Sequence, residues 1–393
     1  MCNNNKEFPN TKRLGIAAGL VGMLAGMGSA AAGPTIPHGE QGFLTLNYEF
    51  QLWAQYRDYR SDAIDGDLHD FFLRRNRVTF TGHYNDFLGF YAQIEAGNDG
   101  RDGNENRPTY FRDAYVTFDW SDALRVMAGR FKNTFSRENL EACFEPLTLD
   151  RGLISYTPFA GTRDTGVALW GNLANAHVQY RVMVADGRQT DARPASSQRT
   201  TARVHVSLLD PEYFYGYRGT YLGTQRVLTL GAAYDYQPDM TYADFGTRNA
   251  ARDYSAWTVD GFFEYPTGAG TLTLSGAYFS YSVDDALMGV DPDPGLPASS
   301  ELEGYYLKGG YLLPGRIGPG QLQLFGRHDR AEYDRADDFL DYEIYAAGFN
   351  YYLDGQGVKF TFEYAETHFD QQHPTLHSLQ DHKQATLGFQ MLF

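Results

Sequence analysis

The sequence predicts an all-β protein, a transmembrane antiparallel β-barrel of about sixteen strands with long external loops and short periplasmic turns. Three observations lead to this fold class. Apolar and polar residues alternate in segment after segment, the links between segments alternate in length, and the chain ends on an alternating apolar segment. After the N-terminal region no stretch approaches the roughly 18 to 20 uninterrupted apolar residues that a membrane helix needs, so a helical membrane protein is excluded.

The first candidate strand, LTLNYEFQLWAQY at 44–56, shows the alternation most clearly. Every second position is apolar, and the positions between them are polar except Trp53. Successive side chains of a strand point to opposite faces, so this strand has one apolar face and one polar face. In a closed barrel the apolar face meets lipid and the polar face meets a water-filled lumen, and closure leaves no unpaired strand edge in hydrocarbon.

Similar segments recur to the C-terminus, each near the ~9 to 11 residues that cross an outer membrane at a tilt. Their even number suits a bacterial barrel. The candidate strands are 43–57, 71–84, 87–98, 109–120, 123–133, 164–173, 176–186, 199–209, 225–237, 253–265, 270–282, 302–313, 320–331, 341–353, 357–367 and 383–393.

The links between these strands alternate in length. Short links such as Asn85-Asp86 and Ser121-Asp122 have the composition of tight turns. A transmembrane barrel has this rhythm, with short periplasmic turns and long external loops, whereas a soluble sandwich has no need of it. The long links, rich in Asp, Pro, Gly and Ser, are 58–70, 99–108, 134–163, 187–198, 238–252, 283–301 and 368–382.

Aromatic residues make up 15% of the chain, and many lie near strand ends, for example Trp53, Trp120 and Tyr265. Amphipathic rings are favoured at membrane interfaces, so we expect them there. The last segment, QATLGFQMLF, is apolar at alternate positions through Phe393. It resembles the C-terminal recognition signal of bacterial outer-membrane barrels.

The N-terminus predicts a signal peptide over residues 1–32, followed by one barrel domain over 33–393. Lys6, Lys12 and Arg13 form a basic region, residues 14–27 an apolar core, and residues 30–32 an A-x-A cleavage site. The formal net charge is −16, and losing three basic residues and one acidic residue with the signal makes it −18. Such acidity excludes a nucleic-acid partner. We expect the bacterial outer membrane as the location.

Catalytic and cofactor chemistry have little support in the sequence. Only Cys143 follows residue 32, so no internal disulfide is possible, and no C-x-x-C-H run offers a covalent haem site. No G-x-S-x-G motif is present, and no serine near a histidine has a visible third partner, so we predict no enzyme and no cofactor. No metal site is predicted, because Pro374 prevents a helix from aligning the weak candidates His368, His373, His377 and His382.

Five stretches resemble one known family. They are FFLRRNRVTFTGHY (71–84), FRDAYVTFDW (111–120), GRFKNTF (129–135), TRDTGVALWG (162–171) and AAGFNYYLDGQGVKFTFEY (346–364). In this order they resemble the phosphate-selective porins of the O and P type. The resemblance implies a sixteen-stranded outer-membrane porin, commonly trimeric, in which basic lumen residues guide anions through a constriction lined by an infolded loop.

The chain departs from that family in its basic residues. Phosphate selection there is associated with clustered lysines and a ladder of arginines, but only four lysines, against 26 arginines, follow residue 32. A general or differently selective porin therefore stays open beside a phosphate-selective one. Lys132, in the GRFK motif, is the lysine that the resemblance carries over.

Candidate pore-lining residues follow from alternation on the strands and from the long 134–163 link. A charge on the lipid face at mid-bilayer costs ~2 to 4 kcal/mol, so strand cations that alternate with apolar residues should face inward. The alternative is that they pair with the inward carboxylates Glu49, Glu95, Asp113 and Glu363 and only satisfy the lumen wall. The predicted lining residues are Arg75, Arg77, Arg125, Lys132, Arg137, Arg151, Lys308, Arg327 and Lys359.

The 134–163 link is the longest and carries its own apolar residues, including Leu140, Phe144 and Leu147. A long loop of this kind should pack against something. We hypothesise that it folds into the barrel and forms the constriction, so that deleting 140–158 raises single-channel conductance. The alternative is an external loop that packs on neighbouring loops or subunits.

The sequence therefore predicts an outer-membrane porin for small, anionic or polar solutes, embedded in outer-membrane lipid and assembled as a homotrimer. The alternative function is a porin-like scaffold barrel that sheathes or anchors a periplasmic or electron-transfer partner. Ion conductance by the isolated protein would favour the channel, whereas co-purification with a multihaem cytochrome would favour the scaffold.

Overall fold

The structure is a computed structural model that describes residues 33–59, 67–96, 108–155, 162–188, 195–244, 246–283, 301–333, 340–371 and 380–393. The predicted signal peptide at 1–32 lies outside these residues and stays a prediction. Within the described ranges, no helix has the length and apolar character needed to cross a membrane.

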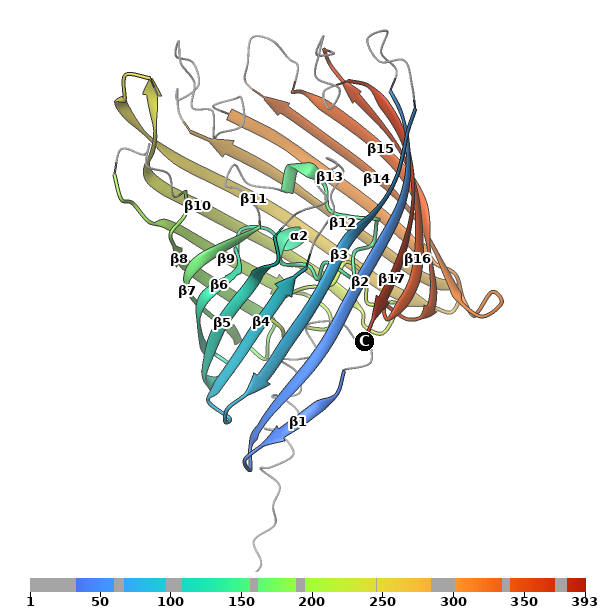
Figure 1. Ribbon diagram of the computed structural model, residues 1–393, viewed down its shortest axis with the longest axis horizontal. Coiled ribbons are helices and arrows are strands. Elements are labelled where there is room, and N and C mark those ends of the chain that lie inside the picture. Colours follow the sequence, from blue (N-terminus) through green and yellow to red (C-terminus); the bar gives the residue numbers. More distant parts are fainter. Residues whose placement is uncertain are drawn as a thin grey trace, which may run out of the picture.

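The fold is a closed antiparallel β-barrel of sixteen strands, β2 to β17, with a short extra strand β1 paired to β2. Each strand pairs with the next along the chain, and β17 pairs with β2 through contacts such as Phe389 with Leu52, which closes the ring (Figure 1). The fold class and all sixteen predicted strands are confirmed. The strands are β1 (Thr35–His38), β2 (Gly42–Tyr59), β3 (Asp67–His83), β4 (Leu88–Glu95), β5 (Tyr110–Ser121), β6 (Leu124–Lys132), β7 (Arg163–Leu173), β8 (Val178–Ala185), β9 (Arg199–Ser207), β10 (Val227–Asp244), β11 (Asn249–Thr267), β12 (Gly270–Ser282), β13 (Glu301–Leu312), β14 (Gln321–Tyr333), β15 (Tyr342–Asp354), β16 (Val358–Phe369) and β17 (His382–Leu392).

The two faces of β2 follow the predicted alternation. Leu52 is 37% exposed on the outer face, whereas its neighbour Gln51 is 4% exposed inside the barrel. The exposed apolar side chains of the outer wall are those that lipid would cover. Among the aromatic residues, Trp120 and Tyr265 lie exposed on the outer surface, but Trp53 is buried inside against Phe72 and Leu149. The expectation of an interfacial position is therefore wrong for Trp53, because strand alternation turns it inward.

The hairpin of β10 and β11 extends further than the sequence pattern indicates. Residues 238–252 were expected to form a long loop, but Thr241 pairs with Arg252 and Asp244 pairs with Asn249. The register shifts between Gln237 and Thr241. Pro238 has no backbone N–H to donate to the ladder, so a bulge at this point lets the pairing resume beyond it.

Two β-bulges change the direction of arginine side chains. In β3, Gln51 pairs with Arg75 and Leu52 with Leu73, so Arg74 is the extra residue. In β5, Gln93 pairs with Asp113 and Ile94 with Phe111, so Arg112 is the extra residue. A bulge breaks the alternation of faces, and both Arg74 and Arg112 contact carboxylates inside the barrel.

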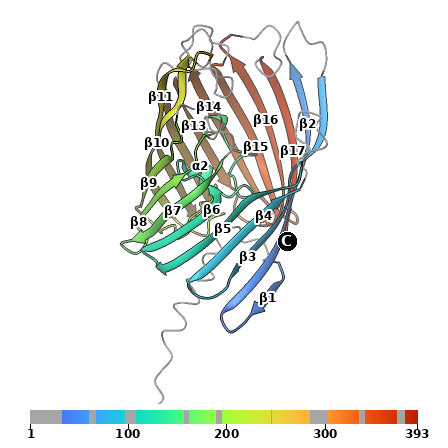
Figure 2. The same cartoon turned by 60° about the vertical axis from the view of Figure 1, so that its left-hand side comes forward.

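The interior of the barrel is filled by two segments of the same chain. One connects β6 to β7 and contains α2 (Arg137–Leu140) and the 3₁₀ helix η1 (Leu153–Ser155). The other, 208–226, connects β9 to β10 at the end of the barrel that holds the short turns, and it is an exception to the rhythm of link lengths. Figures 1 and 2 show α2 within the ring of strands.

Candidate channel lining and constriction

The segment that contains α2 is anchored to the inner wall by polar contacts. Ser136 caps α2 by accepting a hydrogen bond from the Asn139 backbone N–H at 3.1 Å. Beyond α2, the Leu147 carbonyl accepts a hydrogen bond from the Asn350 side chain at 2.8 Å, and the Leu149 N–H donates to the Glu363 carboxylate at 3.2 Å. The prediction that the 134–163 link folds into the barrel is therefore confirmed for its described residues.

Apolar packing supports the same position. Phe135 and Ile154 are buried against the inner surface of β11 to β15, next to Phe279 and Tyr306. The Tyr281 hydroxyl donates a hydrogen bond to the Ile154 carbonyl at 3.0 Å. This part of the lumen is thus a packed core.

The connection 208–226 meets the same segment from the opposite end of the barrel. Ala142 N–H donates to the Tyr217 carbonyl at 2.9 Å, Tyr217 N–H to the Leu140 carbonyl at 3.3 Å, and Gly219 N–H to the Glu145 carbonyl at 2.9 Å. The two segments therefore form a short backbone ladder inside the lumen.

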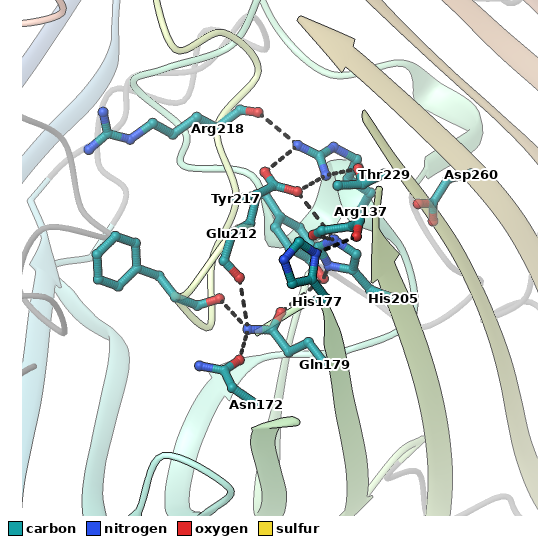
Figure 3. Close-up of polar contacts among 12 residues, drawn as sticks. Arg137, Asn172, His177, Gln179, His205, Glu212, Tyr217, Arg218, Thr229 and Asp260 are labelled. Carbon is teal, nitrogen blue, oxygen red and sulfur yellow. Dashed lines mark hydrogen bonds and ion pairs between the residues drawn. The ribbon is translucent and has the colours of Figure 1, made fainter. Parts of the chain in front are cut away.

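A buried ion pair holds the two segments together. Both terminal nitrogens of Arg137 donate to Glu212 at 2.8 Å (Figure 3). The guanidinium also lies 4.0 Å from the ring centre of Phe262. Burial opposes ionisation of Glu212, but the charge and hydrogen bonds of Arg137 lower its pKa to about 2. The pair is therefore fully ionised at neutral pH.

Arginines of β8 and β9 line the wall behind this contact and were missed by the sequence reasoning. Arg203 pairs with Asp260 through both terminal nitrogens at 2.6 and 2.8 Å. Arg181 donates to the Tyr217 hydroxyl and the Tyr215 carbonyl, both at 2.6 Å. The alternation RTTARVHVS, with Arg199 and Arg203 four residues apart, was the signal that could have placed them inward.

Most of the predicted lining cations contact partners on the inner wall or on the inward segments. Arg125 lies apart, near the turn end, where it pairs with Asp122 at 2.5 Å and lies 4.6 Å from the ring centre of Trp170. The other partners are Asp150 for Arg75, Glu95 for Arg77, the Leu140 and Glu141 carbonyls for Lys132, Glu212 for Arg137, the Cys143 sulfur for Arg151, Glu138 for Lys308, Asp329 for Arg327, and Gln356 with the Phe144 carbonyl for Lys359. Their role in guiding solutes stays a prediction.

The inward carboxylates named in the alternative interpretation also have partners. Asp113 binds Arg163 at 3.0 Å, and Glu49 accepts hydrogen bonds from Gln93 at 2.9 Å and Thr79 at 3.3 Å. Burying an ion costs several kcal/mol unless it is paired, which explains why each has at least one polar partner. Pairing alone does not exclude a conducting role, because the number of cations for each carboxylate decides the local charge.

A cavity of about 450 Å³ remains between the α2 segment and the inner wall of β3 to β7. Its lining combines a largely aromatic wall with four basic and four acidic side chains, which are Arg77, Arg125, Lys132, Arg163, Glu49, Asp113, Asp122 and Glu145. Cys143, a free thiol that is 8% exposed, also lines it. Burial alone would raise the pKa of this thiol, but the surrounding cations, led by Arg151, lower it well below its usual value.

The histidine candidates lie at the loop end of β16 and β17. His368 and His382 are described, whereas His373 and His377 fall outside the described residues. His368 contacts Asp381 at 3.4 Å, and His382 contacts the Gln380 carbonyl at 2.9 Å. In the described ranges, no group of three or more His, Cys, Asp or Glu side chains is placed to hold a metal ion.

The closed sixteen-stranded barrel with an apolar outer wall, a charged interior and an inward-folded loop is that of a porin of the bacterial outer membrane. The chain belongs to the family of the phosphate-selective porins O and P, whose profile matches residues 46–393. The resemblance found in the sequence is confirmed.

Individual relatives are distant. An uncharacterized protein of Aquifex aeolicus (strain VF5) is 21% identical over 364 residues, covering 84% of this chain and 82% of the relative. The anion-selective porin from Comamonas acidovorans is 13% identical with a TM-score of 0.60, covering 90% of this chain and 100% of that one. Salmonella typhi OmpF, solved with daunomycin, is 12% identical with a TM-score of 0.60, covering 92% and 100%. At these identities the solved structures show the fold.

Proposed function

We propose that this porin conducts small anions along the space between the α2 segment and the inner wall of β3 to β7. We also infer that residues 1–32 are removed as a signal peptide and that residues 33–393 act as one barrel domain in a homotrimer. One solved relative of similar fold is an anion-selective porin, which agrees with the proposal.

The observation that carries the proposal is the sharing of carboxylates between arginines. Asp150 contacts both Arg74, at 2.6 Å, and Arg75, at 2.9 Å. Glu95 likewise contacts both Arg77, at 2.6 Å, and Arg112, at 3.3 Å. In both contacts two guanidinium groups therefore face one shared carboxylate.

This local excess matters more for permeation than the net charge of the chain. Interactions between exposed charges are screened beyond about 8 Å at physiological ionic strength, so acidic residues on distant loops contribute little inside the lumen. Rings of unneutralised charge at a constriction set the ion preference of a channel. The arginines of β3 and β5 that share a carboxylate therefore support anion passage although the whole chain is acidic.

Planar-bilayer recording tests the proposal. The reversal potential under a salt gradient should show anion preference in the purified protein, and added phosphate should reveal whether that anion blocks the current. Cation preference would overturn anion selectivity but keep the porin, and no current at all would overturn the channel.

Two substitutions make the test specific. Arg112→Gln and Arg74→Gln each remove one cation, while Glu95 and Asp150 keep their second arginine, so no buried carboxylate is left unpaired. Both variants should move the reversal potential toward cation preference. Arg226→Gln removes an exposed arginine at the turn end, paired with Asp210 at 3.2 Å, and should leave the potential unchanged.

The scaffold alternative has less support. The described part of the lumen is occupied by the chain's own segments, 133–155 and 208–226, which fill the space that a sheathed partner would need. Co-purification of a multihaem cytochrome from native membranes, with no current from the isolated barrel, would reverse this preference. Chemical cross-linking in native membranes tests the homotrimer.

A further inference from the structure

We propose that the cavity beside Arg77 is a binding site for a small carboxylic acid with a flat ring, rather than for inorganic phosphate. This inference rests on the proposed anion channel and names the class of solute that its pathway binds. The cavity volume of about 450 Å³ lies within the range of small-molecule sites. It lies between the α2 segment and the inner wall of β3 to β7.

Aromatic side chains form the wall of this cavity. Tyr91 of β4 and Tyr115 of β5 stack at 5.2 Å between ring centres, and Phe131 of β6 meets Tyr115 edge-on at 6.2 Å. On the far side Trp170 of β7 contacts Tyr215 edge-on at 5.4 Å. Stacked and edge-on rings of this kind offer a flat, apolar solute the geometries that aromatic pairs prefer.

The guanidinium of Arg77 is positioned to receive a carboxylate. Its Nε donates to Glu95 at 2.6 Å, and its plane lies 5.3 Å from the ring centre of Phe144. Among the described residues, its two terminal nitrogens make no hydrogen bond, although the side chain lines the cavity. These two contacts hold the guanidinium group in place, and its two terminal nitrogens match the bidentate geometry of a carboxylate.

Lys132 also lines the cavity. Lys132 donates to the Glu141 carbonyl at 2.5 Å and to the Leu140 carbonyl at 3.5 Å, and within the described ranges it has no carboxylate partner. Lys132 therefore offers a nitrogen donor that no described carboxylate contacts. The acid group of a solute would lie between these cations, with its ring directed along the aromatic wall.

The aromatic wall discriminates between classes of anion. Phosphate has no apolar surface. Its transfer from water to a site beside aromatic rings therefore costs desolvation free energy that contacts with the rings do not offset. A ring-bearing acid buries apolar area against the same wall, which favours binding, while its carboxylate accepts hydrogen bonds from the Arg77 guanidinium. The site should therefore favour the organic acid.

Isothermal titration calorimetry on the detergent-solubilised full barrel tests the inference, with 4-hydroxybenzoate as the probe and phosphate as the comparison. Saturable binding of 4-hydroxybenzoate, with phosphate at least about tenfold weaker, is expected. Arg77→Gln should weaken binding by about tenfold or more, because charge-assisted hydrogen bonds contribute about 1.5 to 3 kcal/mol. Arg226→Gln, outside the cavity, is the matched control and should bind as the wild type does.

Two further measurements protect the test against misfolding and locate the site. Met127→Trp fills the cavity without a change of charge and should also abolish binding, while heat-dependent migration on a gel reports the folded barrel. Cys143 lines the same cavity, so 4-hydroxybenzoate should slow its reaction with an anionic methanethiosulfonate, and phosphate should not.

The outcomes separate this inference from the proposed function. Equal binding of phosphate and 4-hydroxybenzoate would overturn the solute class, and no binding of either with intact anion current would overturn the site alone. Binding of 4-hydroxybenzoate without any current would keep the site and overturn the channel.

Discussion

The ion pair between Arg137 and Glu212 should hold the interior of the barrel closed, and Glu212→Gln should loosen it. The pair joins the α2 segment to 208–226, two segments that enter from opposite ends of the barrel. The substitution preserves side-chain shape but removes the carboxylate charge. Arg137 then remains buried without its main partner, so we expect the two segments to separate more often.

The magnitude follows from the structure in two ways. The pKa of Glu212 falls from an ordinary value of 4.5 to about 2, which corresponds to roughly 3 kcal/mol in favour of the ionised carboxylate. Removing one partner of a buried pair typically costs about 3 to 5 kcal/mol. Glu141, 3.6 Å from the Arg137 Nε, compensates in part, so the lower end applies. Roughly 3 kcal/mol changes the open population about a hundredfold.

Single-channel recording at neutral pH provides the assay. Glu212→Gln should show frequent openings to a larger conductance that are rare in the wild type. Asp210→Asn, on the same connection, breaks the exposed pair with Arg226 and should change little, because such pairs contribute about 0 to 1 kcal/mol. A folded Glu212→Gln barrel with wild-type conductance and dwell times would refute the reasoning.

The pH dependence of this contact has a definite sign. The pKa of Glu212 in the folded protein lies below its ordinary value, so the stabilisation is complete above about pH 4.5 and is lost as the pH falls toward 2. Glu212 itself should therefore produce no change in gating at neutral or mildly acidic pH.

Further predictions concern the same interior. Burial raises the pKa of Glu141 to about 7. The protonated Glu141 therefore stabilises the folded interior fully below pH 4.5, and this stabilisation is lost as the pH rises through 7. Larger openings should become more frequent above neutral pH in the wild type but not in Glu141→Gln. An anionic methanethiosulfonate should react with Cys143 at neutral pH and reduce the current, because the lowered thiol pKa favours the thiolate, and Cys143→Ser should be unaffected. Replacing 211–225 with an Asn-Gly turn should raise conductance, and deleting 140–158 should do the same. Either change removes one of the two segments that contact each other in the lumen. Unchanged conductance in a folded barrel would contradict this prediction.

Local patterns in the sequence determined the strands and the orientation of most side chains. A two-residue period needs only neighbouring residues, so the segment at 44–56 was sufficient to separate a lipid face from a lumen face. The same period placed Arg75 and Arg77 inside, where the structure has them. The apolar content of the 134–163 link also indicated that it would pack against something, but it left the interior and an external position both open.

The tertiary structure alone decided which arginines share a carboxylate. Strict alternation directs Arg74 and Arg112 toward lipid, and only the pairing register with β2 and β4 makes them bulge residues that turn inward. Register depends on partner strands, so no local pattern contains it.

The same holds for the contact that fills the lumen. Arg137 and Glu212 are 75 residues apart in the sequence, and no local pattern indicates that they pair. They meet because barrel closure brings the β6–β7 and β9–β10 connections into one enclosed space, where a buried charge needs an opposite charge beside it. The strands and their faces were therefore determined locally, whereas the contents of the lumen depended on contacts that only the closed barrel creates.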